Sequence, residues 1–194
     1  MIEAISGLSA AFGLAGSAGL NAYIPLLLVA LAARFPLADP LLKLSEPYQA
    51  IGSWWAIGLL VVLLAIEMTV DKIPAIDSLN DTIQTFIRPA AGALLFAANA
   101  NVVTDIHPAL AVVAGILLAG GVHATKGATR PLVTASTAGT GNWLVSLGED
   151  IVAFFISLLA LLAPIVAAVL VIILLYVGVR WLRRRRKNKQ VVYR

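Results

Sequence analysis

The chain has 194 residues, of which 60% are hydrophobic and 12% charged, whereas an ordinary soluble domain carries about 25% charged residues. This composition indicates an integral membrane protein. Because a membrane-spanning helix needs roughly 20 apolar residues, the length allows about five or six spans and leaves no room for a soluble domain. The chain contains no cysteine, which excludes disulfides, thiolate metal ligands and a cysteine nucleophile.

The formal net charge of +4 arises from a cluster of basic residues in segment 180–194. Cytoplasmic segments of membrane proteins carry an excess of lysine and arginine, so we expect the C-terminus in the cytoplasm. The same tail could contact anionic lipids, but it is too short to carry a nucleic-acid recognition fold. The chain therefore divides into one transmembrane domain, residues 1–182, and a basic cytoplasmic tail, residues 183–194.

The first apolar segment, residues 8–34, is interrupted halfway by small and polar residues between Gly16 and Pro25. Pro25 lacks a backbone N–H donor, and Asn21 places a polar group near the middle of the membrane. This pattern predicts a kink or a break into two half-helices. It is also typical of a small-residue face that lets another helix approach closely, and the two interpretations are compatible.

The second span is predicted from Trp54 to Thr69, since tryptophans often lie at the headgroup level. It ends with Glu67 and Asp71, four residues apart and hence on one helical face. Acids at a helix C-terminus oppose the helix dipole, and two on one face repel each other. We therefore expect a cationic group opposite them.

Residues 76–80 predict a turn, and an amphipathic stretch begins at Asp81. A third span is predicted over residues 90–103 and a short fourth span over residues 109–121. The hydroxyl-rich segment 123–142 is too polar to face lipid, so we expect it to be buried in protein or to line a cavity.

The final apolar run, residues 151–182, is the most hydrophobic part of the chain and contains Pro164. It is longer than a single span requires. We therefore expect a helix that is tilted or kinked in the membrane.

An internal similarity relates residues 19–26 to residues 126–132, and a helix headed by tryptophan recurs at Trp54 and Trp143. Each half would hold three membrane elements, an odd number, so the halves would have opposite orientations. This is the inverted-repeat plan of many secondary transporters, whose paired helix breaks mark the binding site. Six crossings would also place the N-terminus on the side of the tail. The proposed halves are residues 1–105 and 108–182.

Two Arg-Pro pairs, Arg88-Pro89 and Arg130-Pro131, precede runs of small apolar residues. Because proline fits the first turn of a helix, each arginine would flank a helix N-terminus, which favours anions. With Lys126 they would form a pocket for a phosphate- or carboxylate-bearing substrate. Alternatively, Arg88 and Arg130 only neutralise nearby carboxylates, since buried charges are usually paired.

The carboxylates offer a different chemistry. Glu67 with Asp71, and Glu149 with Asp150, could coordinate a hard cation or carry protons. Enzyme motifs of membrane phosphatases and phospholipid-synthesising transferases are absent, so we expect no catalytic residue, no metal site and no cofactor. The chain has two histidines, and both are interpreted as hydrogen-bonded structural residues.

Four motifs together resemble a family of small bacterial integral membrane proteins described as domain-of-unknown-function family 4126. The motifs are Gly19 to Leu26, Glu67 to Asp77, Phe86 to Ala93, and Lys126 to Pro131 with Gly148-Glu149-Asp150. The resemblance covers nearly the whole chain except the basic tail. It implies a bacterial membrane domain, and it implies no activity or substrate.

We therefore expect an all-α polytopic bundle in the bacterial inner membrane that works as a small transporter or flippase-like carrier of an anionic or phosphate-bearing substrate. The alternatives are a cation or proton channel, or exchanger, that uses the carboxylates, and a non-transporting scaffold. Expected partners are membrane lipids, an anionic or lipid substrate and a second copy of the chain, but no nucleic acid. The expected substrate-binding residues are Asn21, Arg88, Lys126, Thr129 and Arg130. The expected gating or proton-carrying residues are Glu67, Asp71, Asp77, Asp81, Glu149 and Asp150.

Overall fold

The computed structural model describes residues 2–35, 44, 46–70, 74–100, 106–137 and 141–191, and all regular structure within them is helical. The elements are α1 (Ile2–Ala18), α2 (Tyr23–Arg34), the 3-10 helix η1 (Tyr48–Gly52), α3 (Trp54–Val70), α4 (Pro74–Ala100), α5 (Pro108–Thr137), α6 (Asn142–Leu162) and α7 (Pro164–Val191). The prediction of an all-α protein is confirmed. The predicted second span coincides with α3 except for its last residue.

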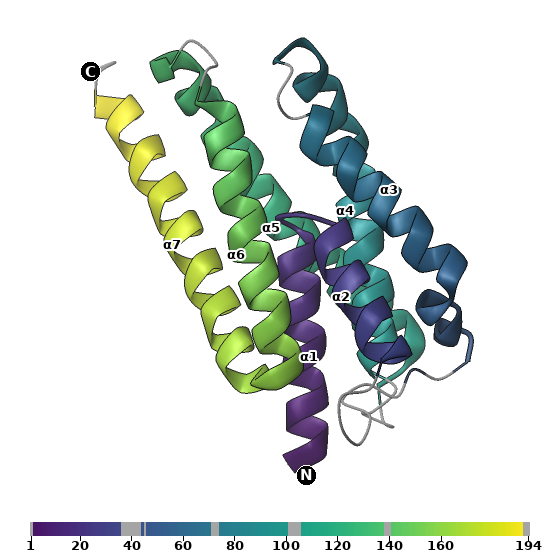
Figure 1. Ribbon diagram of the computed structural model, residues 1–194. Coiled ribbons are helices and arrows are strands. Elements are labelled where there is room, and N and C mark those ends of the chain that lie inside the picture. Colours follow the sequence, from purple (N-terminus) through teal and green to yellow (C-terminus); the bar gives the residue numbers. More distant parts are fainter. Residues whose placement is uncertain are drawn as a thin grey trace.

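The predicted interruption of the first apolar segment is confirmed, since α1 ends at Ala18 and α2 begins at Tyr23. The Oδ1 atom of Asn21 accepts hydrogen bonds from the backbone N–H groups of Tyr23 (2.9 Å) and Ile24 (3.1 Å), and thereby satisfies free amides of α2. Figure 1 shows that α1 and α2 form a hairpin whose tip lies midway along the bundle. The 12 residues of α2 rise about 18 Å, well short of a hydrocarbon core roughly 30 Å thick.

The second interpretation of this segment, a small-residue packing face, also holds. A Cβ atom on Gly16 would overlap α7, and one on Gly19 would overlap the backbone of Ala119 in α5. Where α4 crosses α5, Gly92 and Gly115 bring the two backbones into direct contact. Such close approach is how small residues let membrane helices pack tightly.

Several predictions for the middle of the chain are wrong, because α4 and α5 are longer than expected. Residues 76–80 form no turn but lie inside α4, which continues through Pro89. The short fourth span is only the first part of α5, which continues through Pro131. Segment 126–132 is therefore not a second helix break. A proline removes one backbone hydrogen bond, and packing against neighbouring helices holds the remainder of each helix in place.

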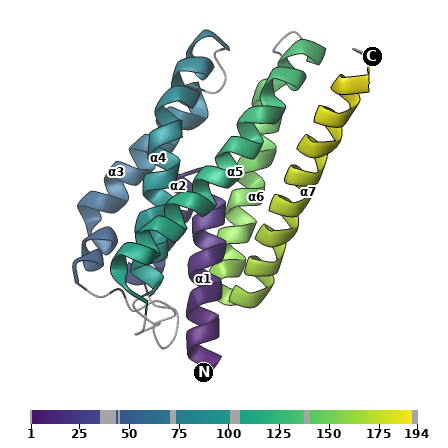
Figure 2. The same ribbon diagram turned by 180° about the vertical axis from the view of Figure 1, so that it is seen from behind.

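The last apolar run is two helices and not one kinked span. α6 ends at Leu162 and α7 begins at Pro164, and the two helices run antiparallel (Figures 1 and 2). The residue before a proline is disfavoured in a helix, while proline itself suits the first helical turn. Ala163 accordingly leaves the helical region, with φ = −142° and ψ = 68°.

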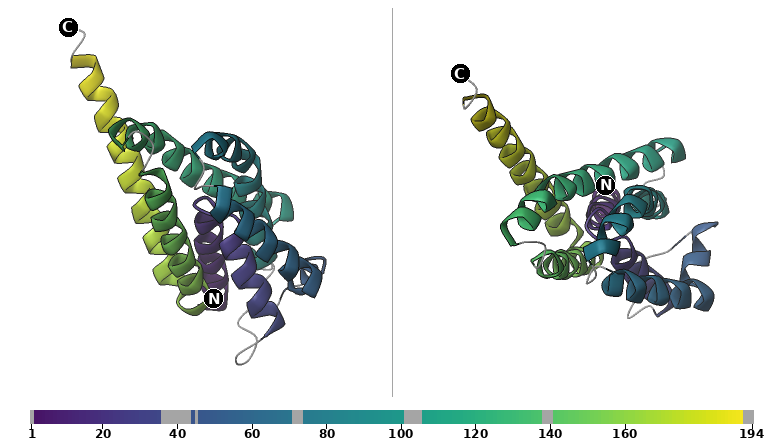
Figure 3. Two further views of the ribbon diagram at one scale, coloured as in Figure 1. Left: turned by 45° about the horizontal axis from the view of Figure 1, so that its top comes forward. Right: turned by 90° about the horizontal axis from the view of Figure 1, so that it is seen from above.

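α1 lies in the middle of the bundle, in contact with α2, α4, α5, α6 and α7, as the view from above in Figure 3 shows. It begins at one end of the bundle, whereas α7 ends at the opposite end (Figures 1 and 2). The expectation that the N-terminus lies beside the basic tail is therefore wrong. The reason is the hairpin, because the first segment turns back at its tip, midway along the bundle, instead of continuing to the opposite end (Figure 1).

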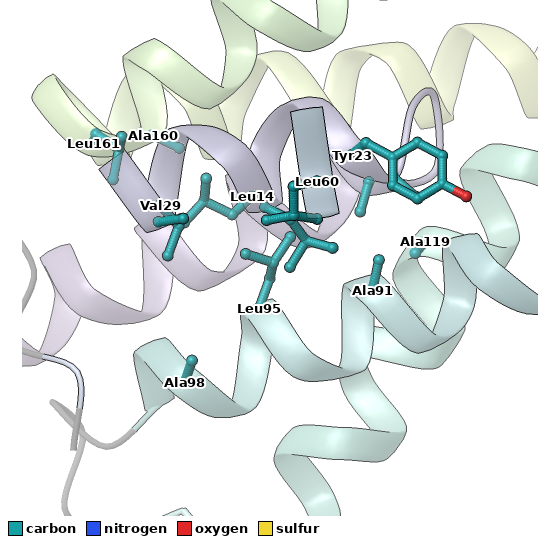
Figure 4. Packing of buried hydrophobic residues seen from close by; sticks show 14 of the residues in the cluster. Leu14, Tyr23, Val29, Leu60, Ala91, Leu95, Ala98, Ala119, Ala160 and Leu161 are labelled. Carbon is teal, nitrogen blue, oxygen red and sulfur yellow. The ribbon is translucent and has the colours of Figure 1, made fainter. Parts of the chain in front are cut away.

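The buried core lies around α1, where Leu14, Val29 of α2 and Leu95 of α4 are fully buried in one apolar cluster (Figure 4). The outer faces also carry large apolar side chains, such as Val62 and Ile172. α5, α6 and residues 164–181 of α7 are each long and apolar enough to cross a membrane. Exposed apolar surface on this scale fits a protein that is surrounded by lipid.

Candidate functional site

A buried ion pair joins α3 to α4. The Nη2 atom of Arg88 lies 3.1 Å from Oε1 of Glu67, and the two side chains are 2% and 3% exposed. The cation that lies opposite Glu67 is therefore Arg88, while Asp71 is outside the described residues. Taking both charges out of water is costly, and the close pairing offsets much of that cost.

His123 of α5 extends this pair into a chain of hydrogen bonds. Nη1 of Arg88 lies 3.2 Å from Nδ1 of His123, and Nε2 of His123 lies 3.2 Å from the hydroxyl of Thr85. An arginine side chain only donates, so Nδ1 must accept and the imidazole is neutral with its proton on Nε2. Thr85 then accepts from Nε2 and donates its own proton to the backbone oxygen of Asp81 at 2.9 Å.

Gln84 and Tyr23 complete this group. Gln84 precedes Arg88 by one turn of α4, is almost fully buried, and lies beside the phenol of Tyr23. The phenol oxygen points away from the apolar cluster in Figure 4. We define the closed cluster as Tyr23, Glu67, Gln84, Thr85, Arg88 and His123.

A second ion pair joins α5 to α6. Nζ of Lys126 lies 2.6 Å from Oε2 of Glu149, and the two side chains are 3% and 14% exposed. The same Nζ donates to the backbone oxygen of Leu20 at 3.3 Å, which lies in the tip of the α1–α2 hairpin. Lys126 therefore holds both a carboxylate and the tip.

Asp150, which follows Glu149 in α6, also holds the hairpin tip. Nδ2 of Asn21 donates to Oδ1 of Asp150 at 2.9 Å, while Oδ1 of Asn21 satisfies the first amides of α2. Deeper in the hairpin, the hydroxyl of Ser17 donates to the backbone oxygen of Ala153 at 2.8 Å. The break between α1 and α2 is thus fixed to α6 by the side chains of Ser17 in α1 and of Asn21 in the break itself.

The Lys126–Glu149 pair lies on the wall of an open cavity of about 440 Å³ between α5, α6 and α7. The hydroxyls of Thr125 and Thr129 donate to carbonyls of their own helix, at 2.9 and 2.7 Å, so toward the cavity they can only accept. We call this cavity the open pocket. Its lining residues are Leu20, Val122, Thr125, Lys126, Thr129, Val145, Gly148, Glu149, Val152, Leu174 and Leu175.

The structure thus separates the predicted site residues into two groups. Lys126, Thr129 and Glu149 line the open pocket, and Asn21 and Asp150 adjoin it. Glu67 and Arg88 belong to the closed cluster, where Asp81 contributes its backbone oxygen. Asp71 and the side chains of Asp77 and Arg130 lie outside the described residues.

The expected placement of the two Arg-Pro pairs at helix N-termini is wrong. Pro89 lies inside α4 and Pro131 inside α5, so neither Arg-Pro pair flanks a helix end with free amides. Arg88 instead pairs with Glu67, as the alternative interpretation expected. Within the described part of the chain, no group of three or more His, Asp or Glu side chains could hold a metal ion.

Sequence reasoning did not single out Tyr23 or Gln84. It did expect segment 123–142 to be buried or to line a cavity, and Thr125, Lys126 and Thr129 of this segment line the open pocket. His123 was expected to be a hydrogen-bonded structural residue, and its contacts with Arg88 and Thr85 agree with that. The sequence signal for these two partners of His123 is their spacing, because Thr85 and Arg88 are three residues apart and lie on one face of an amphipathic helix.

The sequence pattern that defines the family described as "Domain of unknown function (DUF4126)" matches residues 8–184. No curated protein matches the chain, and no solved structure matches it.

Proposed function

We propose that this chain, which belongs to the DUF4126 family, is a small membrane carrier for an amphipathic anion. The apolar part of the substrate would occupy the open pocket, and its anionic group, a phosphate or another acid, would bind Lys126. The observation that carries this proposal is a buried lysine on the wall of a mostly apolar cavity of about 440 Å³, a size within the range of small-molecule sites.

The position of Lys126 supports this assignment. A charged side chain inside a membrane bundle is costly and usually marks a substrate or ion pathway. Arg88 carries the same charge but has its guanidinium closed in by Glu67 and His123. Lys126 instead faces a cavity, and its partner Glu149 keeps part of its surface exposed there. The open pocket therefore gives an incoming anion access to Lys126, whereas Arg88 is not among its lining residues.

The hairpin tip would be the gate. Leu20 lines the open pocket, and its backbone oxygen accepts from Lys126. A substrate anion that takes the N–H donors of Nζ now used by that carbonyl and by Glu149 would displace both acceptors. Loss of the contact would remove the hydrogen bond between the tip and α5, while Gly19 stays packed against Ala119 of α5 and Asn21 still holds the tip to α6. The expected roles of Glu149 and Asp150 as gating residues fit this arrangement.

For the topology, we propose that α3 to α7 cross the inner membrane and that the α1–α2 hairpin enters it from one side only. The short length of α2 supports the partial entry, and the basic tail would lie in the cytoplasm. An inverted repeat of the two halves remains a prediction. A second copy of the chain is also a proposed partner, since the outer faces are apolar.

Binding by the detergent-solubilised protein tests the proposal. Octanesulfonate serves as a probe, because it joins a single chain to an acid that stays ionised. At about a hundred times its dissociation constant it should stabilise the protein by roughly 2.7 kcal/mol. Lys126→Gln should lose this shift, and Arg180→Gln, which removes an exposed arginine that contacts Tyr176, should keep it. Equal shifts in the wild type and Lys126→Gln, or no shift in either, would contradict the proposal.

Transport is then measured separately. Proteoliposomes loaded with the probe should release it faster than empty liposomes do, and the Lys126→Gln protein should not accelerate release. Binding without any accelerated release would identify a receptor or scaffold and would contradict the carrier.

A second candidate, proton or cation movement along the carboxylates, is favoured by one observation. The hydrogen bonds from Glu67 through Arg88 and His123 to Thr85 form an unbroken polar path between α3 and α5. Under this alternative, Glu67→Gln should abolish a pH-driven ion flux in proteoliposomes while probe binding at Lys126 persists. Flux that survives in Glu67→Gln would exclude it.

A further inference from the structure

The open pocket is already close to electrical balance before any substrate enters. Among the described residues that line it are one cation, Lys126, and one anion, Glu149, with 2.6 Å between Nζ and Oε2. A substrate anion that binds Lys126 adds a negative charge to a poorly solvated site. An uncompensated buried charge costs several kcal/mol, and two carboxylate-like groups that share one site do not both remain ionised.

The surroundings of Glu149 make this excess larger. Asp150, the next residue of α6, adds another carboxyl group and binds Asn21 at the hairpin tip. α5 contributes His123, which is held neutral by its contact with Arg88 of α4, and the side chain of Arg130 lies outside the described residues. The lining residues from α7 and the hairpin, Leu174, Leu175 and Leu20, bring no titratable side chain.

We infer that the substrate anion binds together with a proton, which Glu149 accepts when the anion takes its place at Lys126. This inference rests on the carrier function proposed above. A proton from water forms an O–H bond with the carboxylate of Glu149, while Lys126 remains an ammonium ion. The pocket then holds one cation and one anion, as it did before binding. Uptake of anion and proton is therefore electroneutral.

The surroundings of Glu149 bear on which of its oxygens takes the proton. Its side chain is more exposed than that of Lys126, but its Oε2 atom, which pairs with Lys126, is itself buried. The proton therefore goes to Oε1. The neighbouring lining residue Gly148 has no heavy atom within 4 Å of the place where its Cβ atom would lie, so α6 is open beside Glu149.

Isothermal titration of octanesulfonate into the detergent-solubilised protein tests this inference. Titrations at equal pH in two buffers of different ionisation enthalpy report the protons taken up with the probe. The wild type should take up about one proton per probe molecule, and its affinity should fall about tenfold for each unit of rising pH. The sign follows from the mechanism, because a lower proton concentration disfavours the protonated complex.

Two matched variants locate the proton. Glu149→Gln carries no titratable carboxyl, so it should bind the probe without proton uptake and without the pH dependence. Glu46→Gln makes the same change at an exposed acid outside the open pocket and should keep both. Proton uptake that persists in Glu149→Gln, or that disappears in Glu46→Gln as well, would overturn the assignment to Glu149.

The outcomes also separate this inference from the carrier itself. Probe binding that depends on Lys126 but involves no proton uptake overturns the coupled proton and leaves the proposed binding site standing. No binding to the wild type overturns both. Proton release instead of uptake contradicts the inference directly, because it would require the carboxyl group to be protonated before binding.

Discussion

The closed cluster and the open pocket each contain a buried ion pair, but the surroundings of the two pairs differ. Each pairs a basic residue with a glutamate from a neighbouring helix, Arg88 with Glu67 and Lys126 with Glu149. Arg88 is fully enclosed and has a second contact with His123, whereas the Lys126 pair borders a cavity. A buried charge is thus not by itself a binding site, and under the proposed function access to the cavity decides which of the two pairs exchanges partners.

The largest expected effect comes from breaking the closed pair on one side. Arg88→Gln should lower the free energy of unfolding by about 3–5 kcal/mol, because it leaves the carboxylate of Glu67 buried without its cation. Thermal unfolding in detergent measures the loss. The double variant Glu67→Gln/Arg88→Gln, which leaves no unpaired charge, should recover much of it. An Arg88→Gln protein that unfolds like the wild type would show that the two clusters do not differ as described.

The equivalent substitution in the open pocket, Lys126→Gln, should reduce stability less than Arg88→Gln does and should reduce probe binding more. Lys126→Gln leaves a carboxylate that is partly exposed to the cavity, so its loss in unfolding free energy should be smaller than that of Arg88→Gln. It should, however, lose the probe-induced stabilisation of roughly 2.7 kcal/mol. Unfolding curves recorded with and without octanesulfonate test both parts, and the reverse ranking of stability would contradict the comparison.

The hairpin tip should respond next. Asn21→Ala removes the acceptor that satisfies α2 and the donor to Asp150, with an expected cost of about 2 kcal/mol. Asn21→Ser is the matched control, because serine retains the cap but not the contact with Asp150. It should lie between Asn21→Ala and the wild type in thermal unfolding. Equal losses in both variants would mean that the cap contributes nothing.

The smallest expected effect is at the edge of the closed cluster. Thr85→Val keeps the shape of the side chain and removes the group that accepts from His123, which should cost about 1 kcal/mol. Probe binding at Lys126 should be unchanged. A loss of binding would show that the two clusters are coupled through α5, where His123 and Lys126 lie one turn apart.

The elements whose signals are local could be predicted from the sequence. Trp54 marks the start of α3 and Asn21 marks the break between α1 and α2, because these residues act on their own backbone or at the membrane surface. Pro25, the other residue from which the break was predicted, lies in the first turn of α2. Pro89, Pro131 and Pro164 could not be read in this way. Two of them continue a helix and one begins a new helix after a reversal, and the packing of neighbouring helices decides between these outcomes.

The candidate site shows the same limit. Lys126, Glu149, Asn21 and Asp150 were all recognisable as polar groups out of place in an apolar chain. Their pairing could not be predicted, because it joins α5 to α6 and the hairpin to α6. Residues so far apart in the sequence come together only through the fold. The shape of the open pocket is even harder to predict from the sequence, since most of its lining residues are ordinary apolar side chains.

One titration tests the central claim most directly. Octanesulfonate is added to the wild type, to Lys126→Gln and to Glu67→Gln/Arg88→Gln, and thermal unfolding is followed for all three. We predict that the probe stabilises the wild type and the double variant alike and leaves Lys126→Gln unchanged. Stabilisation that persists in Lys126→Gln and disappears in the double variant would contradict the account, because it would place the anion at Arg88 instead of Lys126.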